Sequence, residues 1–271
     1  DFGRPNFLVT RLVTRRLTNA TNERSMIAAV TPDFPSSDTT LRWEIDAPST
    51  HKHIALACVL SSLAFDWMFR LRVAGATGAT ALDLGRLSEL MIPGSVGKEV
   101  SRLYSIAGLL DLSAAVFAPV LLSNDPRLVP TKWALTRHER LRLRCILDAI
   151  VAALYDLSRD DLRWILRDCD HPKERVTNRD FARTLDPKGF WRVDKDEDPE
   201  LRHTVLTQVA FDALAALIVM HNGDRDAGIA AFSALNDGEG WLLPETLRLK
   251  DHDLGHDARA EVAQPVASRL G

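Results

Sequence analysis

The feature that most constrains this fold is residues 51–73, where apolar side chains lie on most faces of the helix that the sequence predicts. Such a helix has no broad face suited to water, so it belongs at the centre of the molecule. The apolar run within it, residues 54–65, is shorter than the roughly 20 residues that cross a bilayer. Asp66 and Arg70 close the run. We therefore expect a buried core helix and no membrane as a partner.

The remaining apolar pattern predicts strands first and helices afterwards. Residues 6–17, 25–31 and 41–46 are short runs of β-branched, aromatic or alternating residues, which are typical of strands. Thr136 with Glu139, and Ser158 with Asp161, are spaced as capping boxes. Asp198-Pro199 has the pattern of an N-cap followed by proline at the first helical position. Helices are expected over residues 96–122, 136–154, 159–166, 199–220 and 226–235.

Together these elements predict an α+β, predominantly helical fold, with a small N-terminal β-hairpin or strand region packed on a helical bundle. The 271 residues are enough for one large domain or two small ones. We place the division at residues 1–130, a strand-containing DNA-recognition subdomain, and 131–271, a helical C-terminal subdomain.

Charge and cysteine content limit the classes of protein. Residues 1–155 carry 18 Lys and Arg against 14 Asp and Glu, a net +4, whereas residues 156–271 carry 16 against 23, a net −7. Contact with a polyanion is therefore expected in the first half. Cys58, Cys145 and Cys169 are widely spaced and odd in number. Their pattern predicts reduced thiols and a cytoplasmic protein.

Motifs for catalysis are missing from the sequence. It has no P-loop, no nucleophile elbow, no glycine-rich cofactor loop after a strand and no adenine-pocket motif. Asp194, Asp196 and Asp198 resemble the start of a calcium loop, but Pro199 stands where glycine is required. His252 and His256 have helical spacing in a polar tail, where disorder is the simpler interpretation. We therefore predict no catalytic residue, metal or cofactor in this chain.

A binding surface remains as the candidate site. Arginine and asparagine read guanine and adenine edges in the major groove, and arginine, lysine and threonine contact phosphates. Such residues cluster in and after the first predicted strand, and again around the Gly75–Gly78 break. The alternative is a set of ordinary solvated side chains. The candidate DNA-binding residues are Arg11, Arg15, Arg16, Asn19, Asn22, Arg24, Arg70, Arg72, Thr77, Thr80, Arg86 and Lys98.

Two motifs that follow one another along the chain resemble those of a known family. The segment RPNFLVTRLVTRRLTNATNERSMIAAVTP resembles the start of the recognition region in type IIG restriction–modification methylases, with matches at Asn22, Glu23, Arg24, Ser25, Ile27, Ala28, Ala29 and Pro32. The segment ALACVLSSLAFDWMFRLRV resembles the helix that follows there, with matches at Leu60, Ser61, Ser62, Phe65, Asp66, Trp67, Arg70 and Arg72. Ser61 stands where asparagine is common.

Later segments extend the resemblance to roughly residues 4–220. Leu87, Leu90 and Pro93 match a leucine-rich segment ending in proline, although the loop at residues 74–80 lacks the His-Leu-Asn type of residues typical of the family. Residues 144–166 resemble the family's closing helical hairpin, and residues 189–211 resemble a tail found in a subset of its members.

The resemblance implies a parent protein that methylates adenine N6 with S-adenosylmethionine, commonly in phage defence. In this chain it implies DNA sequence recognition, with double-stranded DNA and an N-terminal methyltransferase domain as partners. Because the chain begins at Asp1-Phe2-Gly3, we expect the catalytic motifs upstream. One alternative is a helical protein-interaction or spacer domain of a phage-defence complex. A less favoured one is an independent enzyme with an unrecognised site.

Overall fold

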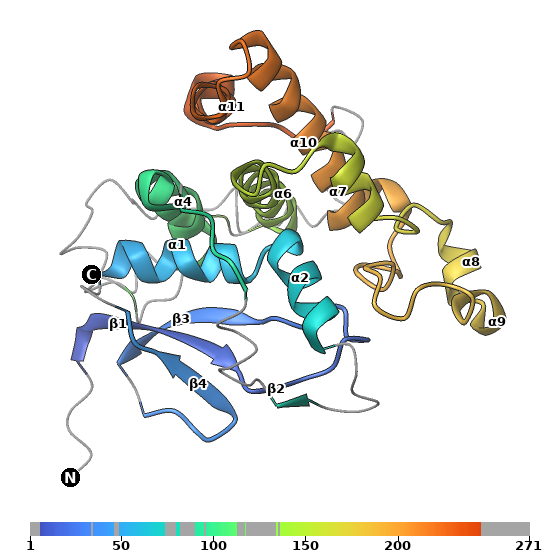
Figure 1. Cartoon of the computed structure of the whole chain (residues 1–271), viewed down its shortest axis with the longest axis horizontal. Helices are drawn as coiled ribbons and strands as arrows, with labels where there is room; N and C mark the ends of the chain where they lie inside the picture. Colours follow the sequence, from blue (N-terminus) through green and yellow to red (C-terminus); the bar gives the residue numbers. More distant parts are fainter. Residues whose placement is uncertain are drawn as a thin grey trace.

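A computed structural model describes residues 6–33, 35–45, 49–73, 80–81, 90–94, 96–112, 117, 134 and 136–244. Figure 1 shows a small sheet at one side of the molecule, with α1 and α2 lying against it. Helices α4 and α6 come next, and α10 and α11 lie furthest from the sheet. The predicted α+β, mostly helical fold class is confirmed.

The sheet is formed by the three predicted strands. β1 (Asn6–Arg15) lies in the middle and pairs antiparallel with β3 (Ala28–Asp33) and with β4 (Thr40–Trp43). Thr10, Leu12 and Thr14 alternate along β1 and are buried beneath the helices. A second, two-stranded ladder joins β2 (Leu17–Thr18) to β5 (Thr80–Ala81).

The central helix is broken, so the prediction of one helix over residues 51–73 is wrong. α1 (Thr50–Leu60) and α2 (Leu63–Val73) meet at a bend of 63°. The Ser62 hydroxyl donates to the Val59 carbonyl and accepts from the Phe65 N–H at 3.1 Å. The carboxylate of Asp148 accepts from the Leu63 N–H at 2.6 Å. These side-chain acceptors take N–H groups at the start of α2, so the helix begins anew there.

α4 (Val96–Asp111) and α6 (Arg137–Leu154) form the next layer. α1 packs on β1 and β3 and also on α4, while α6 contacts α2, α4 and α10. The predicted helix over residues 96–122 ends in the structure at Asp111, and most of residues 113–133 lie outside the described part. Thr136 caps α6 as predicted, since its hydroxyl accepts from the Glu139 N–H.

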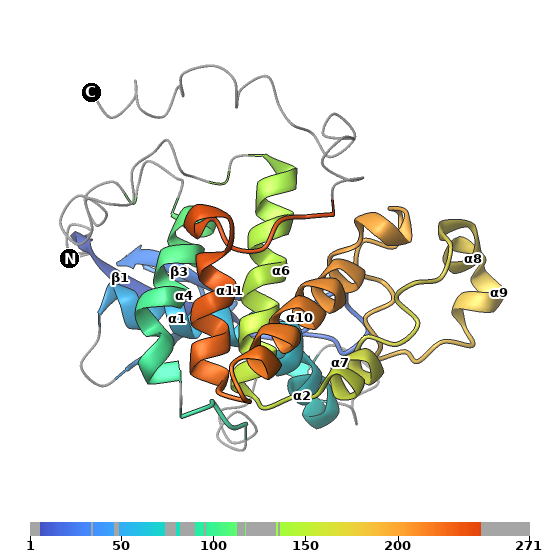
Figure 2. The same cartoon turned by 90° about the horizontal axis from the view of Figure 1, so that it is seen from above.

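Short helices connect the bundle to its last layer. α7 (Arg159–Ile165) begins with the predicted capping box of Ser158 and Asp161. α8 (Lys173–Thr177) and α9 (Arg179–Ala182) follow within the polar connector, where Val176, Leu185 and Trp191 form a small core of their own. Figure 2 shows α8 and α9 at the end of the molecule away from α4.

The start of α10 corrects another prediction. Asp198 and Pro199 start a separate 3-10 turn, Pro199–Leu201, instead of the long helix, and the side chain of Asp198 makes no capping hydrogen bond there. α10 (His203–Met220) begins after it, and the Asp194 carboxylate accepts from the His203 N–H at 3.0 Å. α11 (Arg225–Gly238) packs along α10, with a non-helical break at residues 235–237.

The largest buried cluster runs from Leu12 in β1 to Leu243 after α11. It therefore includes side chains from both sides of the proposed division at residue 130. That division stays a prediction, because residues 118–133 lie outside the described part.

α10 has the length and composition of a membrane-spanning helix. Its 18 residues have a mean hydropathy of 1.6, and 39% of them are buried in the fold. From the sequence, only residues 54–65 were considered as a span. α10 packs against α6, α7 and α11 with part of its surface, and Val209, Val219 and Met220 remain exposed.

Candidate nucleic-acid interface

Two of the predicted DNA-binding residues, Arg15 and Arg16, lie exposed where β1 ends. The side chain of Arg15 makes no hydrogen bond or ion pair among the described residues, and Arg16 Nη1 donates to the Asp38 carbonyl at 3.2 Å. β2 follows directly, and Thr18 pairs with Thr80 of β5. This pairing brings Thr80, from the second predicted cluster, next to the segment that carries Arg15 and Arg16. This edge, Arg15–Thr18 with Thr80–Ala81, is called the ladder edge below.

Arg11 is turned towards its neighbours in the sheet. Its Nε lies 3.1 Å from Asp33 Oδ1 and its Nη2 lies 3.3 Å from Oδ2, a bidentate pair. Arg42 joins the same carboxylate at 2.7 Å. The hydrogen bond from Arg11, together with the two positive charges, lowers the pKa of Asp33. With its guanidinium engaged in this pair, Arg11 is a weaker candidate for reading DNA than predicted.

Arg70 corrects the prediction most clearly, because its side chain is 0% exposed. Its guanidinium donates to the carbonyls of Asn22 and Glu23, to those of Lys188 and Gly189, and to Asp66. Such a group cannot touch DNA in this conformation. It instead fixes three separate chain segments, which is the structural role that a planar fork of five donors suits.

Asp66 completes this buried cluster from the same helix. Its carboxylate accepts from the Ser25 N–H at 3.1 Å and from the Met26 N–H at 2.8 Å. These bonds hold the connector after β2, residues 19–27, against α2. They also explain why the second strand begins at Ala28 rather than at Ser25: the main chain before it is bonded to a side chain and not to another strand.

Arg24 lies over the same cluster and is partly withdrawn from solvent. Its Nε is 3.6 Å from Asp66 Oδ2, and its side chain is 21% exposed. Its Nη1 is buried and has no hydrogen-bond partner among the described residues. Arg24 therefore faces the interior, where it lines a cavity between the connector and the helices.

The remaining predicted residues are less informative. The Asn19 side chain accepts from the N–H and the hydroxyl of Thr21, which makes a local turn. Arg72 is exposed in the last turn of α2. Asn22 contributes its main-chain carbonyl to Arg70. Thr77, Arg86 and the side chains of Thr80 and Lys98 lie outside the described part of the chain.

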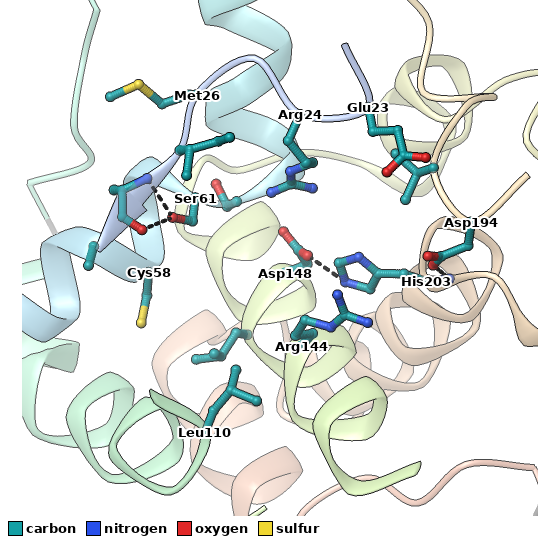
Figure 3. A pocket seen from close by; sticks show the side chains of 16 residues that line it. Glu23, Arg24, Met26, Cys58, Ser61, Leu110, Arg144, Asp148, Asp194 and His203 are labelled. Carbon is teal, nitrogen blue, oxygen red and sulfur yellow. Dashed lines mark hydrogen bonds and ion pairs between the residues drawn. The ribbon is translucent and has the colours of Figure 1, made fainter. Parts of the chain in front are cut away.

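A pair that the sequence analysis did not single out lies at the bottom of the cavity. His203 Nε2, at the start of α10, is 2.8 Å from Asp148 Oδ2 in the middle of α6 (Figure 3). Both side chains are buried. Burial tends to raise the pKa of Asp148, but contact with His203, the charge of Arg24 and the bond from the Leu63 N–H lower it overall. The two residues are 55 positions apart, and no spacing signal connects them.

The cysteines and acidic residues give no sign of redox or metal chemistry among the residues that the structure describes. All three cysteines are buried and form no disulfide. Burial raises the pKa of Cys169 to about 12 and also raises that of Cys145, which disfavours the reactive thiolate. Within the described ranges, no three His, Cys, Asp or Glu residues are grouped as metal ligands. Residues 252 and 256 lie outside those ranges.

Comparison with protein-family models, with curated proteins and with solved structures gave no match.

Proposed function

We propose that this chain is the target-recognition part of a larger S-adenosylmethionine-dependent adenine-N6 DNA methyltransferase or restriction–modification enzyme. In this proposal it binds double-stranded DNA through the ladder edge. An N-terminal methyltransferase domain of the same parent chain supplies the cofactor site and the chemistry.

One observation supports the proposal above the others. The two sequence motifs that resemble the recognition region of type IIG methylases are bonded to each other in the fold. Asp66 and Arg70 of the second motif contact the main chain of Asn22, Glu23, Ser25 and Met26 of the first. Residues that match a family pattern and also form one buried unit are expected when the pattern reflects a shared architecture.

The ladder edge adds a physical reason. A methyltransferase that flips an adenine must hold the duplex and read its neighbouring bases. Exposed arginines beside a turn-rich connector, held by a rigid buried cluster, are suited to that role.

The experiment is a selection from a pool of randomised duplexes with the full chain, followed by titration of the selected duplex at several salt concentrations. Enrichment of one sequence is expected. Arg15→Ala with Arg16→Ala should weaken binding about tenfold or more and reduce the salt slope by roughly 2. The matched control is Arg179→Ala with Arg183→Ala, two exposed arginines, one in α9 and one at its C-cap. Equal affinity of both double variants, or a pool without enrichment, would contradict the proposal.

The second candidate function, a helical protein-interaction or spacer domain, is favoured by a different observation. Three of the predicted DNA-binding arginines, Arg11, Arg24 and Arg70, form ion pairs within the protein. In addition, α10 exposes the apolar side chains of Val209, Val219 and Met220. A pool without enrichment, combined with self-association or capture of a partner through α10, would support this second function.

A further inference from the structure

A cavity of about 290 Å³ lies between the connector, α1, α6 and the start of α10 (Figure 3). It is at the small end of the range for ligand sites. One part of its wall is apolar and includes Met26, Leu110, Leu147 and Val193. The polar part comes from the connector and from the two helices that carry Asp148 and His203.

In this cavity the hydrogen-bond acceptors have more partners than the donors do. Both oxygens of Asp148 are engaged, one by the Leu63 N–H and one by His203. Asp194 accepts from the first N–H of α10. The donors have fewer partners: Arg24 Nη1 is buried without a hydrogen-bond partner, and the exposed side chain of Arg144 makes no hydrogen bond or ion pair among the described residues. A buried donor without an acceptor costs free energy that a ligand can recover.

A second cavity, of about 160 Å³, continues along α6 and shares Arg144 and Asp194 with the first. Arg137 and Arg140 line it, at helical spacing from Arg144 and so on the same side of α6. Arg140 is held by the Leu110 carbonyl, and Arg137 is paired with Glu197 at 2.8 Å. Positive groups therefore lie along the way into the larger cavity.

Three carboxylates that line this cavity oppose an anion. Asp148 and Asp194 are engaged by hydrogen bonds, which leaves Glu23 as the third. It is exposed at the rim, and burial of its carboxyl, with repulsion from Asp194 and Asp196, raises its pKa. A raised pKa makes this carboxylate easier to neutralise than an ordinary glutamate. Removing its charge should make the cavity more favourable to an anion, which provides a test of the direction of the effect.

We propose that the larger cavity binds an oxyanion, the phosphate or carboxylate group of a small and partly apolar ligand, between Arg24 and Arg144. The apolar wall contacts the body of the ligand, and the guanidinium groups supply charge-assisted hydrogen bonds. The oxyanion comes from a free small molecule or from a nucleic-acid backbone, and the experiment below separates these sources. The inference does not rest on DNA recognition at the ladder edge, which involves different residues.

The test uses the full chain with the ring signals of His203 followed by NMR, at an ionic strength held constant with sodium chloride. The probes are inorganic phosphate, phenyl phosphate and a short DNA duplex. Saturable shifts of His203 are expected, with phenyl phosphate tighter than inorganic phosphate because of the apolar wall. Shifts with the two small probes identify a free ligand, and shifts with the duplex alone identify a backbone phosphate.

Three variants sharpen the result. Arg144→Gln, an exposed position where folding should be unaffected, is expected to weaken binding by roughly ten- to a hundredfold. Glu23→Gln should tighten it, and Arg179→Gln, on distant α9, should leave it unchanged. No saturable shift with any probe, or Arg144→Gln binding as tightly as the wild type, would overturn the proposal. Loss of DNA binding at the ladder edge would leave these shifts in place, so the two proposals fail separately.

Discussion

Arg70 is the residue on which the packing of the first half depends most visibly. It is fully buried, lies 4.1 Å from the centre of the Phe190 ring and donates to four main-chain carbonyls. Burial lowers the pKa of Arg70, and the neighbouring Asp66 opposes that shift. An arginine pKa begins so high that the group stays charged at neutral pH. Its charge is paired with Asp66 and its two terminal nitrogens find acceptors inside the protein, whereas its Nε has no hydrogen-bond partner among the described residues.

Replacing Arg70 should be costly for stability. Arg70→Met keeps the apolar bulk but leaves Arg24 as the one basic partner of Asp66 among the described residues and leaves carbonyls without donors. We expect the free energy of unfolding to fall by about 3–5 kcal/mol. Urea denaturation of the variant measures this, with exposed Arg179→Met as the control. A loss below about 1 kcal/mol would mean that the buried cluster around Arg70 contributes little to the stability of the fold.

Asp148 predicts how stability depends on acid. Its folded pKa is lowered, so its stabilising contribution is complete above about pH 5 and is lost as the pH falls through the lowered pKa. Asp148→Asn should cost about 1.5–3 kcal/mol at neutral pH. Melting temperatures measured from pH 7 to pH 2 should show the gap between wild type and variant closing on the acid side. A gap that stays constant with pH would contradict this assignment.

At the scale of elements, the sequence predicted well the helix starts that depend on neighbouring residues. The capping residues Thr136 and Ser158 start α6 and α7 where expected, because an N-cap acts within three residues of itself. The bend between α1 and α2 was missed for the opposite reason. One cause of the bend is the hydrogen bond from the Leu63 N–H to Asp148, which is distant in sequence. The local sequence gives no sign of the bend, because apolar residues lie on both sides of Ser61 and Ser62.

The contact between α10 and α11 depends on the absence of a side chain at Gly228. A Cβ atom placed there would lie 2.5 Å from Ile218 Cγ1 and 2.8 Å from Ile218 Cα. Gly228→Ala must therefore push the two helices apart, and we expect a loss of about 1–3 kcal/mol. Thermal denaturation provides the measurement. Gly94→Ala is the matched control, because a Cβ there meets nothing within 4 Å. An unchanged melting temperature for Gly228→Ala would refute the close packing.

At the scale of the whole molecule, the site was predicted less well than the fold. Residue type suggested that Arg11, Arg24 and Arg70 face outward, since arginine is mostly exposed in proteins. Their carboxylate partners lie elsewhere in the chain: Asp33 is 22 residues from Arg11, and Asp66 is 42 residues from Arg24. Only the fold brings such groups together. Arg15 and Arg16 lie exposed at the end of the first predicted strand. Their position near Thr80 comes from the pairing of β2 with β5, two segments distant in sequence, which the sequence did not predict.

The single large core predicts cooperative unfolding. Side chains from β1, α1, α4, α6, α10 and α11 belong to one buried cluster, which crosses the proposed domain division. One transition is expected in urea, with helix content by circular dichroism and tryptophan fluorescence changing together. Trp67 reports on the first half and Trp241 on the second, and both are buried. Two separated transitions would instead support two independent domains.

Arg70 contacts the connector and the loop at residues 188–189 through carbonyl oxygens, a group that every amino acid possesses. Exchanging the side chains at positions 22, 23 and 188 thus leaves the four acceptors in place, whereas Gly189 is restricted, because a Cβ atom there would lie 3.2 Å from the Asp186 carbonyl oxygen. Positions 22 and 23 of the connector can therefore be changed by mutagenesis, for a different ligand, without redesigning the buried cluster that holds the connector.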